Sequence, residues 1–228
     1  MTTPKHKVLF ILTNTQTIGP NNRPSGYEFS EVARPYLSFI ANEIDVDFAT
    51  IQGGQPPEDG FNPDDAASVV FRGSVGFEQL NNSIPLHAIN PDDYDAVFFP
   101  GGLGPMVDLL DDPTVNQTIA HFADTNRIIG AVCHGPAALL NVTLADGSPL
   151  LHNKRVAAFT TAEEIGHSEH DVPFMLDQKL ESQGALHSAA PPFAPHVVVD
   201  GQLVTGQNPA SAAGVAHAMI ARLYHTQT

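Results

Sequence analysis

Gly130-Ala131-Val132-Cys133-His134-Gly135-Pro136 is the most informative part of this sequence for its fold. An apolar run from Arg127 to Val132 is typical of a buried strand, and it leads directly into the cysteine. Small residues then open a predicted helix at 137–140. This order is typical of a nucleophile elbow, a sharp strand-to-helix turn that projects one reactive side chain. The stretch therefore predicts an α/β fold in which Cys133 ends a buried strand.

Short strand-like runs and helix-like stretches alternate on both sides of the elbow. Asp112-Pro113 and Asn208-Pro209 each resemble an N-cap followed by proline at the first helical position. Pro35 is expected to confine the first helix to the residues after it. The predicted strands are 8–12, 45–51, 96–99, 127–132, 155–159, 196–199 and 203–205, and the predicted helices are 32–43, 112–124 and 210–223.

This alternation predicts an α/β three-layer sandwich, with a mostly parallel central sheet flanked by helices. Asp200-Gly201 lies between the last two strands and predicts a C-terminal antiparallel hairpin with a type I′ turn.

The length of 228 residues and the apolar content of 42% predict one domain over 1–228 with a sizeable core. The segment from Gln52 to Asp95 breaks the rhythm of strands and helices, because it is rich in proline, glycine and aspartate. It is either a long surface excursion or a cover over an active site.

The formal net charge of −15 argues against nucleic acid and against anionic membranes as partners. The single cysteine excludes an internal disulfide. No stretch approaches the ~18 apolar residues of a membrane span. The start of the chain does not resemble a signal peptide, so a cytoplasmic protein is expected. No Gly-x-Gly-x-x-Gly or Walker-type loop is present, so no nucleotide cofactor is expected.

Cys133 has two interpretations from the residues alone. At a helix N-terminus, backbone N–H groups favour the thiolate, so it could be a nucleophile. A lone cysteine can equally be an inert, buried apolar residue. His134 can approach the sulfur only if the elbow is irregular, since neighbours in a regular helix diverge.

Four stretches resemble the ThiJ/PfpI superfamily, which has a class I glutamine amidotransferase-like, flavodoxin-like fold. They are AVCHGPAALL at 131–140, FFPGG at 98–102, GYEFSEVARPY at 26–36 and VTGQNPAS at 204–211. FTTAEE at 159–164 and VPFMLDQKLESQGA at 172–185 resemble the glyoxalase III and stress-chaperone branch.

The resemblance implies roles for particular residues. Cys133 would be the nucleophile, His134 its partner, and Glu31 the glutamate that hydrogen-bonds the cysteine. Glu164 would orient the histidine, although the adjacent Glu163 leaves the register open. The backbone N–H of Gly102, in the Gly101-Gly102 turn, would form an oxyanion hole with that of His134. Glu31 is expected to be protonated, because burial and a neighbouring thiolate both raise the pKa of a carboxyl.

Two other patterns are interpreted as coincidental. Glutaminases of this fold use a His-x-Glu pair far downstream of the cysteine, whereas His167-Ser168-Glu169 is close to Cys133 and lies in a polar loop. His167, Glu169 and His170 form the densest group of possible metal ligands, but no metal is expected there.

The function that the resemblance implies is a cofactor-independent glyoxalase, which converts methylglyoxal to lactate through a cysteine hemithioacetal. The expected partners are small dicarbonyls and a second copy of the chain in a homodimer. The alternatives are a holdase chaperone, a protein deglycase and a cysteine amidase or peptidase.

Overall fold

The computed structural model describes residues 6–225 and is built around a seven-stranded sheet. Its order is β12-β13-β9-β8-β1-β5-β7, and every pairing is parallel except that of β12 with β13. The strands are β1 (Lys7–Leu12), β5 (Asp45–Thr50), β7 (Ile84–Pro85), β8 (Ala96–Phe99), β9 (Ile128–Val132), β12 (Val197–Asp200) and β13 (Leu203–Gly206).

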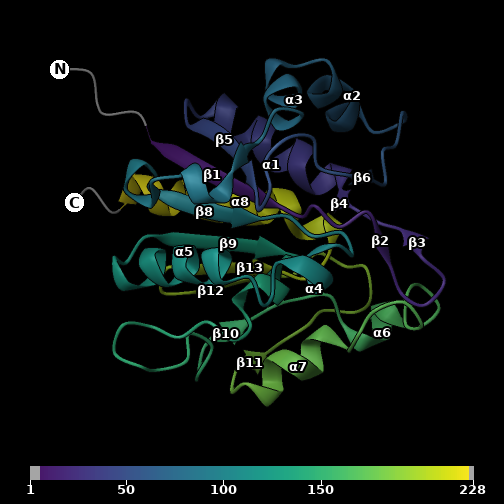
Figure 1. The fold of residues 1–228 in the computed structure, drawn as a ribbon, viewed down its shortest axis with the longest axis vertical. Coiled ribbons are helices and arrows are strands. Elements are labelled where there is room, and N and C mark those ends of the chain that lie inside the picture. Colours follow the sequence, from purple (N-terminus) through teal and green to yellow (C-terminus); the bar gives the residue numbers. More distant parts are fainter. Residues whose placement is uncertain (1–5, 226–228) are drawn as a thin grey trace.

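Alternate residues of the central strands face two separate apolar layers. Leu9 and Ile11 of β1 pack on the side of α5 (Pro113–Asp124), whereas Val8, Phe10 and Leu12 pack on the side of α1 (Phe29–Ala41) and α8 (Ala212–His225). Figure 1 shows α5 on one face of the sheet and α1 and α8 on the other. The predicted α/β sandwich, with its mostly parallel sheet and C-terminal hairpin, is confirmed.

The segment 52–95 packs onto this frame as two short helices. α2 (Ala66–Arg72) and α3 (Val75–Leu80) bury Phe71 and Leu80 in the same layer as α1. β6 (Glu58–Asp59) pairs with β4 (Tyr27–Glu28), directly before α1. The 3₁₀ helices η1 (Leu86–Ala88) and η2 (Pro91–Asp93) then lead into β8.

The segment between β9 and β12 forms a second excursion. It contains η3 (Gly135–Leu139), β10 (Arg155–Val156), α6 (Thr161–Glu164), α7 (Leu176–Ser182) and β11 (Leu186–His187). The remaining short elements include the paired strands β2 (Thr17–Ile18) and β3 (Arg23–Pro24), and the helix α4 (Pro105–Asp108). The 3₁₀ helix η4 (Pro209–Ser211) precedes α8.

The predicted strand 155–159 is wrong. Only Arg155 and Val156 are strand, and they pair with β11 outside the main sheet. The apolar run 156–159 is buried, but its backbone bonds are irregular: Ala157 N donates to Thr205 Oγ1 and Phe159 N donates to Cys133 O. These residues have the apolar pattern of a strand because they are buried, although they make no regular β-sheet hydrogen bonds.

Two further local predictions are wrong. Pro35 lies inside α1, which already begins at Phe29. The hairpin turn has positive φ at Gly201 (59°) but not at Gln202, which matches type II′ instead of type I′, because type I′ needs positive φ at both central residues.

The two proline-led helix starts are both found, with different caps. Asp112 caps α5 by accepting from the N–H groups of Thr114 (2.8 Å) and Val115 (3.0 Å). Asn208 precedes Pro209 but makes no such cap, since its side chain bonds to other segments.

The sheet order reverses between β1 and β8, which creates a switch point. From β1 the chain adds β5 and β7 on one side, and then β8, β9 and β13 on the other. Ligands of open α/β sheets bind at the carboxyl ends of the strands at such a point. In Figure 1 these ends point toward the side where β2, β3 and α6 lie.

Over residues 6–225, none of the helices combines the length and the apolar character that crossing a bilayer would need.

Replacement of Asp112 tests the cap of α5. Asp112→Ala is expected to lower the free energy of unfolding by about 1 kcal/mol, because two N–H groups lose their acceptor. Asp112→Asn keeps a side-chain oxygen and should retain most of that stability. Chemical denaturation measures both variants, and an equal loss for Asp112→Asn would contradict capping as the cause.

Candidate active site

Cys133 directly follows β9 and adopts a backbone conformation that is unusual for a residue with a side chain. Its φ is 60°, in the left-handed region. Both of its backbone groups are held: its N–H donates to Gly206 O and its carbonyl accepts from Phe159 N, each at 2.9 Å. The elbow then continues into η3, so the helix predicted at 137–140 is a 3₁₀ helix that spans Gly135–Leu139.

His134 contacts the cysteine through this irregular turn. Its Nδ1 lies 3.3 Å from Cys133 Sγ, and its Nε2 lies 2.9 Å from Glu164 Oε2. Ser168 Oγ donates to the other carboxylate oxygen of Glu164. All four side chains are almost completely buried. Of the two adjacent glutamates, Glu164 is therefore the one that contacts the histidine.

Glu31 approaches the sulfur from α1. Its carboxyl lies beside the Cys133 thiol, and its Oε2 accepts from Gly101 N at 2.6 Å. Oε1 is buried and has no nitrogen or oxygen partner among the described residues. The carboxyl group lies at the start of the helix that follows β1, close to the switch point of the sheet.

Burial determines the protonation of the Glu31 and Cys133 pair. The pKa of Glu31 is raised well above its ordinary value, first by desolvation and then by the charge of Glu28. Desolvation, followed by the Glu31 charge, likewise raises the pKa of the Cys133 thiol. The protonated Glu31 expected from the sequence fits this direction. A thiolate favoured by a helix N-terminus does not fit it, because only the five-residue η3 follows.

Glu164 shows the opposite behaviour. Desolvation opposes its ionisation, but the hydrogen bond and charge of His134, together with the Ser168 hydroxyl, outweigh burial and lower the pKa of Glu164. A carboxylate at this position fixes the His134 ring with Nε2 as the donor and leaves Nδ1 free to accept a proton from Sγ.

The Gly101-Gly102 turn lies against the sulfur. Gly102 lies beside Cys133 in the cavity wall and has a φ of 87°. A Cβ on Gly101 would lie 2.8 Å from both Cys133 Cβ and His134 N, so the close approach of the two turns requires glycine. This brings the predicted oxyanion-hole residues, Gly102 and His134, to one side of Cys133.

A cavity of about 300 Å³ opens onto Cys133 and His134. Both excursions contribute to its walls, since Asp59 and Gly60 come from the first and Phe159, His167 and Phe193 come from the second. The other lining residues are Arg23, Glu28, Gly102, Leu103 and Pro209. The segment 52–95 thus forms part of the wall of this cavity.

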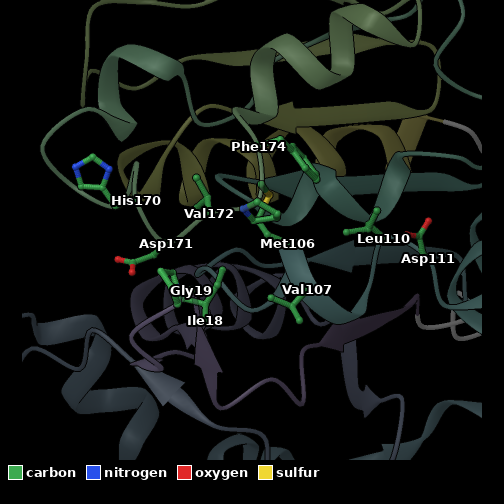
Figure 2. Close-up of a pocket in the computed structure, with 12 residues that line it drawn as sticks. Ile18, Gly19, Met106, Val107, Leu110, Asp111, His170, Asp171, Val172 and Phe174 are labelled. Carbon is green, nitrogen blue, oxygen red and sulfur yellow. The ribbon is translucent and has the colours of Figure 1, made fainter.

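A second and larger cavity, of about 590 Å³, lies away from the cysteine. Figure 2 shows its walls, which come from β2, α4 and the segment 170–174, with His170 at one end and Asp111 at the other. Cys133, His134, Glu31 and Glu164 are all absent from its lining. The candidate site is therefore the smaller cavity.

Several residues at the site were not predicted from the sequence. Ser168 supports Glu164, within the His167-Ser168-Glu169 stretch that looked coincidental. Phe159 packs its ring against His134, with the ring centroids 4.5 Å apart. No local pattern identifies these residues, because their places depend on the path of the chain from 157 to 194.

Glu163 has a structural position beside the site. It is fully buried and accepts hydrogen bonds from Thr160 N and Oγ1 (3.0 and 2.8 Å), Phe193 N (2.8 Å) and Asn208 Nδ2 (2.8 Å). Phe193, which lines the cavity, has a φ of 63°. Glu163 thus joins three segments that surround the candidate site.

In the described part of the chain, no three His, Cys, Asp or Glu side chains converge in a way that could hold a metal ion. Glu169 Oε2 accepts from Gly166 N, and the ring of His170 is 90% exposed.

A parallel sheet whose central strand ends in a strained cysteine, beside a histidine and a glutamate, defines an α/β protein with a nucleophile elbow. The sequence profile of the DJ-1/PfpI family matches residues 24–222 of this chain. The chain belongs to the DJ-1/PfpI family, as its resemblance to ThiJ/PfpI proteins implied.

Individual relatives agree with this assignment. The chain is 30% identical over 220 residues to a glutathione-independent glyoxalase, hsp3102, of Schizosaccharomyces pombe. The match covers 90% of this chain and 91% of that protein. The structure is similar to glyoxalase III from Candida albicans, with a TM-score of 0.84, 26% identity and coverage of 95% and 96%. It is also similar to the Rapid Encystment Protein 24 kDa of Francisella tularensis, with a TM-score of 0.91, 33% identity and coverage of 96% and 99%.

The protonated state of Glu31 predicts how stability depends on pH. Below about pH 4.5, the ordinary pKa of a glutamate, the side chain is neutral in both the folded and the unfolded chain. Above it the unfolded chain loses this proton while the folded chain keeps it, so wild-type stability falls by up to about 1.4 kcal/mol per pH unit until the folded pKa is reached.

Glu31→Gln removes this loss because the amide cannot ionise. The stability advantage of Glu31→Gln over the wild type should therefore be smallest at pH 4 and grow toward pH 8, as measured by denaturation across that range. Glu181→Gln, at an exposed position, is the control. An advantage that does not change with pH would contradict a neutral Glu31.

Glu163→Gln is expected to destabilise the protein. One carboxylate oxygen becomes an NH₂ group facing two donors, which should cost at least about 2 kcal/mol. Denaturation of this variant is compared with the exposed Glu181→Gln, which should stay within about 0.5 kcal/mol of the wild type. Equal stabilities of the two variants would rule out the proposed role of Glu163 in joining the three segments.

Proposed function

We propose that the protein is a glutathione-independent glyoxalase that converts methylglyoxal to lactate, with Cys133 as the nucleophile. One observation carries the proposal: Cys133 Sγ lies 3.3 Å from His134 Nδ1, and His134 Nε2 lies 2.9 Å from Glu164 Oε2. The carboxyl of Glu31 also lies beside the sulfur. The glyoxalase names of its relatives support the same reaction.

In the first step, Cys133 Sγ adds to the aldehyde carbon C1 of methylglyoxal. His134 Nδ1 takes the thiol proton as the C–S bond forms, and the carboxylate of Glu164 stabilises the resulting imidazolium through Nε2. This relay suits a thiol whose pKa is raised by burial, because the proton leaves only when the substrate is present.

The aldehyde oxygen becomes an oxyanion during this addition. The N–H groups of Gly102 and His134, which both lie beside Cys133, would donate to it. The imidazolium then returns its proton to this oxygen, which gives a neutral hemithioacetal.

The hemithioacetal next becomes a thioester by an internal proton transfer. A base removes the C1 proton while O2 gains a proton, which gives an enediol, and a proton is then delivered to C2 as the O1–H proton leaves. His134 can act as this base once it has returned the first proton. C1 is oxidised and C2 is reduced within the same molecule, so no external oxidant is required.

Hydrolysis completes the reaction. Water attacks the lactoyl thioester, lactate leaves, and Cys133 regains its proton. A negative charge gathers on the same carbonyl oxygen in this step, so Gly102 and His134 would serve twice.

Replacement of Cys133 tests the proposal. Cys133→Ala should lose lactate formation from methylglyoxal to the background rate, because no thiol remains to form the hemithioacetal. Purified wild type and variant are assayed for lactate without glutathione. His170→Gln, whose ring is exposed away from Cys133, is the matched control and should keep wild-type turnover.

Wild-type protein that forms no lactate would contradict the glyoxalase assignment. Full turnover by Cys133→Ala would contradict the role of the cysteine while leaving the reaction itself in place.

A further inference from the structure

The ring of His167 occupies the wall of the cavity that contains Cys133. His167 is exposed, and in the described part of the chain its imidazole makes no hydrogen bond or ion pair within the protein. It nevertheless lies close to the catalytic relay, since its charge acts on Glu164 and its ring centroid is 5.8 Å from that of Phe159. The same Phe159 ring packs against His134.

The backbone of His167 is held in place although its ring is free. Its N–H donates to Glu164 O at 2.9 Å, and its carbonyl accepts from Arg23 Nη1 at 2.9 Å. Arg23 also pairs with Asp171 at 3.1 Å. A fixed backbone with an unengaged imidazole at a cavity wall suits a group that acts on a bound molecule.

The proposed reaction needs a second proton donor in addition to His134. Both ring nitrogens of His134 are already engaged, one by Sγ and one by Glu164. When His134 removes the C1 proton, the ketone oxygen O2 must gain a proton from another group. Glu31 contacts the sulfur and Gly101, so it serves the Cys133 end of the substrate.

The other polar groups of the wall are less suited to this role. An arginine guanidinium such as that of Arg23 does not release a proton in proteins. Glu28 caps α1 by accepting from Ser30 N and Oγ. Asp59 is the remaining carboxyl group of the wall, and the experiment below includes it.

We propose that His167 is a second catalytic residue, which moves protons at the two substrate oxygens during the isomerisation; this inference rests on the proposed glyoxalase function. His167, as an imidazolium, donates a proton to O2 and becomes neutral as His134 takes the C1 proton, which gives the enediol. His134 then delivers its proton to C2, and the O1–H proton returns to His167 as the thioester carbonyl forms. Both imidazoles end in their starting states.

The test separates isomerisation from the reactivity of the sulfur. In His167→Gln, kcat for lactate formation from methylglyoxal should fall about 10²-fold, the usual contribution of a general acid–base group, with little change in KM. The rate at which iodoacetamide alkylates Cys133 should stay within twofold of the wild type, because Cys133, His134 and Glu164 are intact.

Two variants complete the design. His170→Gln, three residues along the same loop, should keep wild-type kcat, and Asp59→Asn should lose less kcat than His167→Gln. An unchanged kcat in His167→Gln would overturn the inference but leave the glyoxalase function standing. A parallel fall in the alkylation rate of His167→Gln would also overturn the inference alone, because it would indicate a structural role through Glu164. A large loss of kcat confined to Asp59→Asn would likewise overturn only the inference. Wild-type protein without lactate formation would overturn both proposals.

Discussion

The left-handed backbone of Cys133 is the constraint on which the candidate site depends. A non-glycine residue at φ 60° costs on the order of 1–3 kcal/mol, and hydrogen bonds to Gly206 and Phe159 on its two sides hold it there. In a regular helix the side chains of adjacent residues diverge, so Sγ and the His134 ring would not meet. The strained turn brings them to 3.3 Å and directs the sulfur toward Glu31 and the Gly101-Gly102 turn. Strain at one residue thus creates contacts among four segments.

Two buried glutamates around this turn have pKa values shifted in opposite directions, and their partners explain the difference. Glu31 faces a thiol and a second carboxyl, Glu28, so burial dominates and the pKa of Glu31 rises. Glu164 receives hydrogen bonds from His134 and Ser168, so its pKa falls despite burial. A neutral acid on one side of the sulfur and an anion behind the histidine together let a proton move from Sγ to His134 without creating an unpaired buried charge.

The parts of the structure that were predictable are those that local sequence determines. The elbow at 130–136 and the proline-led start at Asp112-Pro113 carry their own signals, and the order of strands and helices followed from them. Glu31 and Glu164 were identified only through the family resemblance, because a lone glutamate has no distinguishing pattern. The strand error at 155–159 arose because Val156 to Phe159 are buried while their N–H groups bond to Thr205 Oγ1 and Cys133 O. Ser168 and Phe159 reach the site by long-range packing, which no local pattern encodes.

The frame and the walls of the cavity have different origins in the fold. The sulfur, the glycine turn and Glu31 belong to the carboxyl edge of the sheet, whose geometry the strand pairing determines. Part of the cavity wall comes from the excursions 52–95 and 135–196, and loops tolerate changes that a sheet does not. The second excursion is nevertheless not independent of the chemistry. The Phe159 N–H donates to the Cys133 carbonyl, and the Phe159 ring packs against His134. Glu163, also in this excursion, accepts a hydrogen bond from the N–H of Phe193 in the cavity wall. A change in this excursion therefore alters both what enters the cavity and how the sulfur is held.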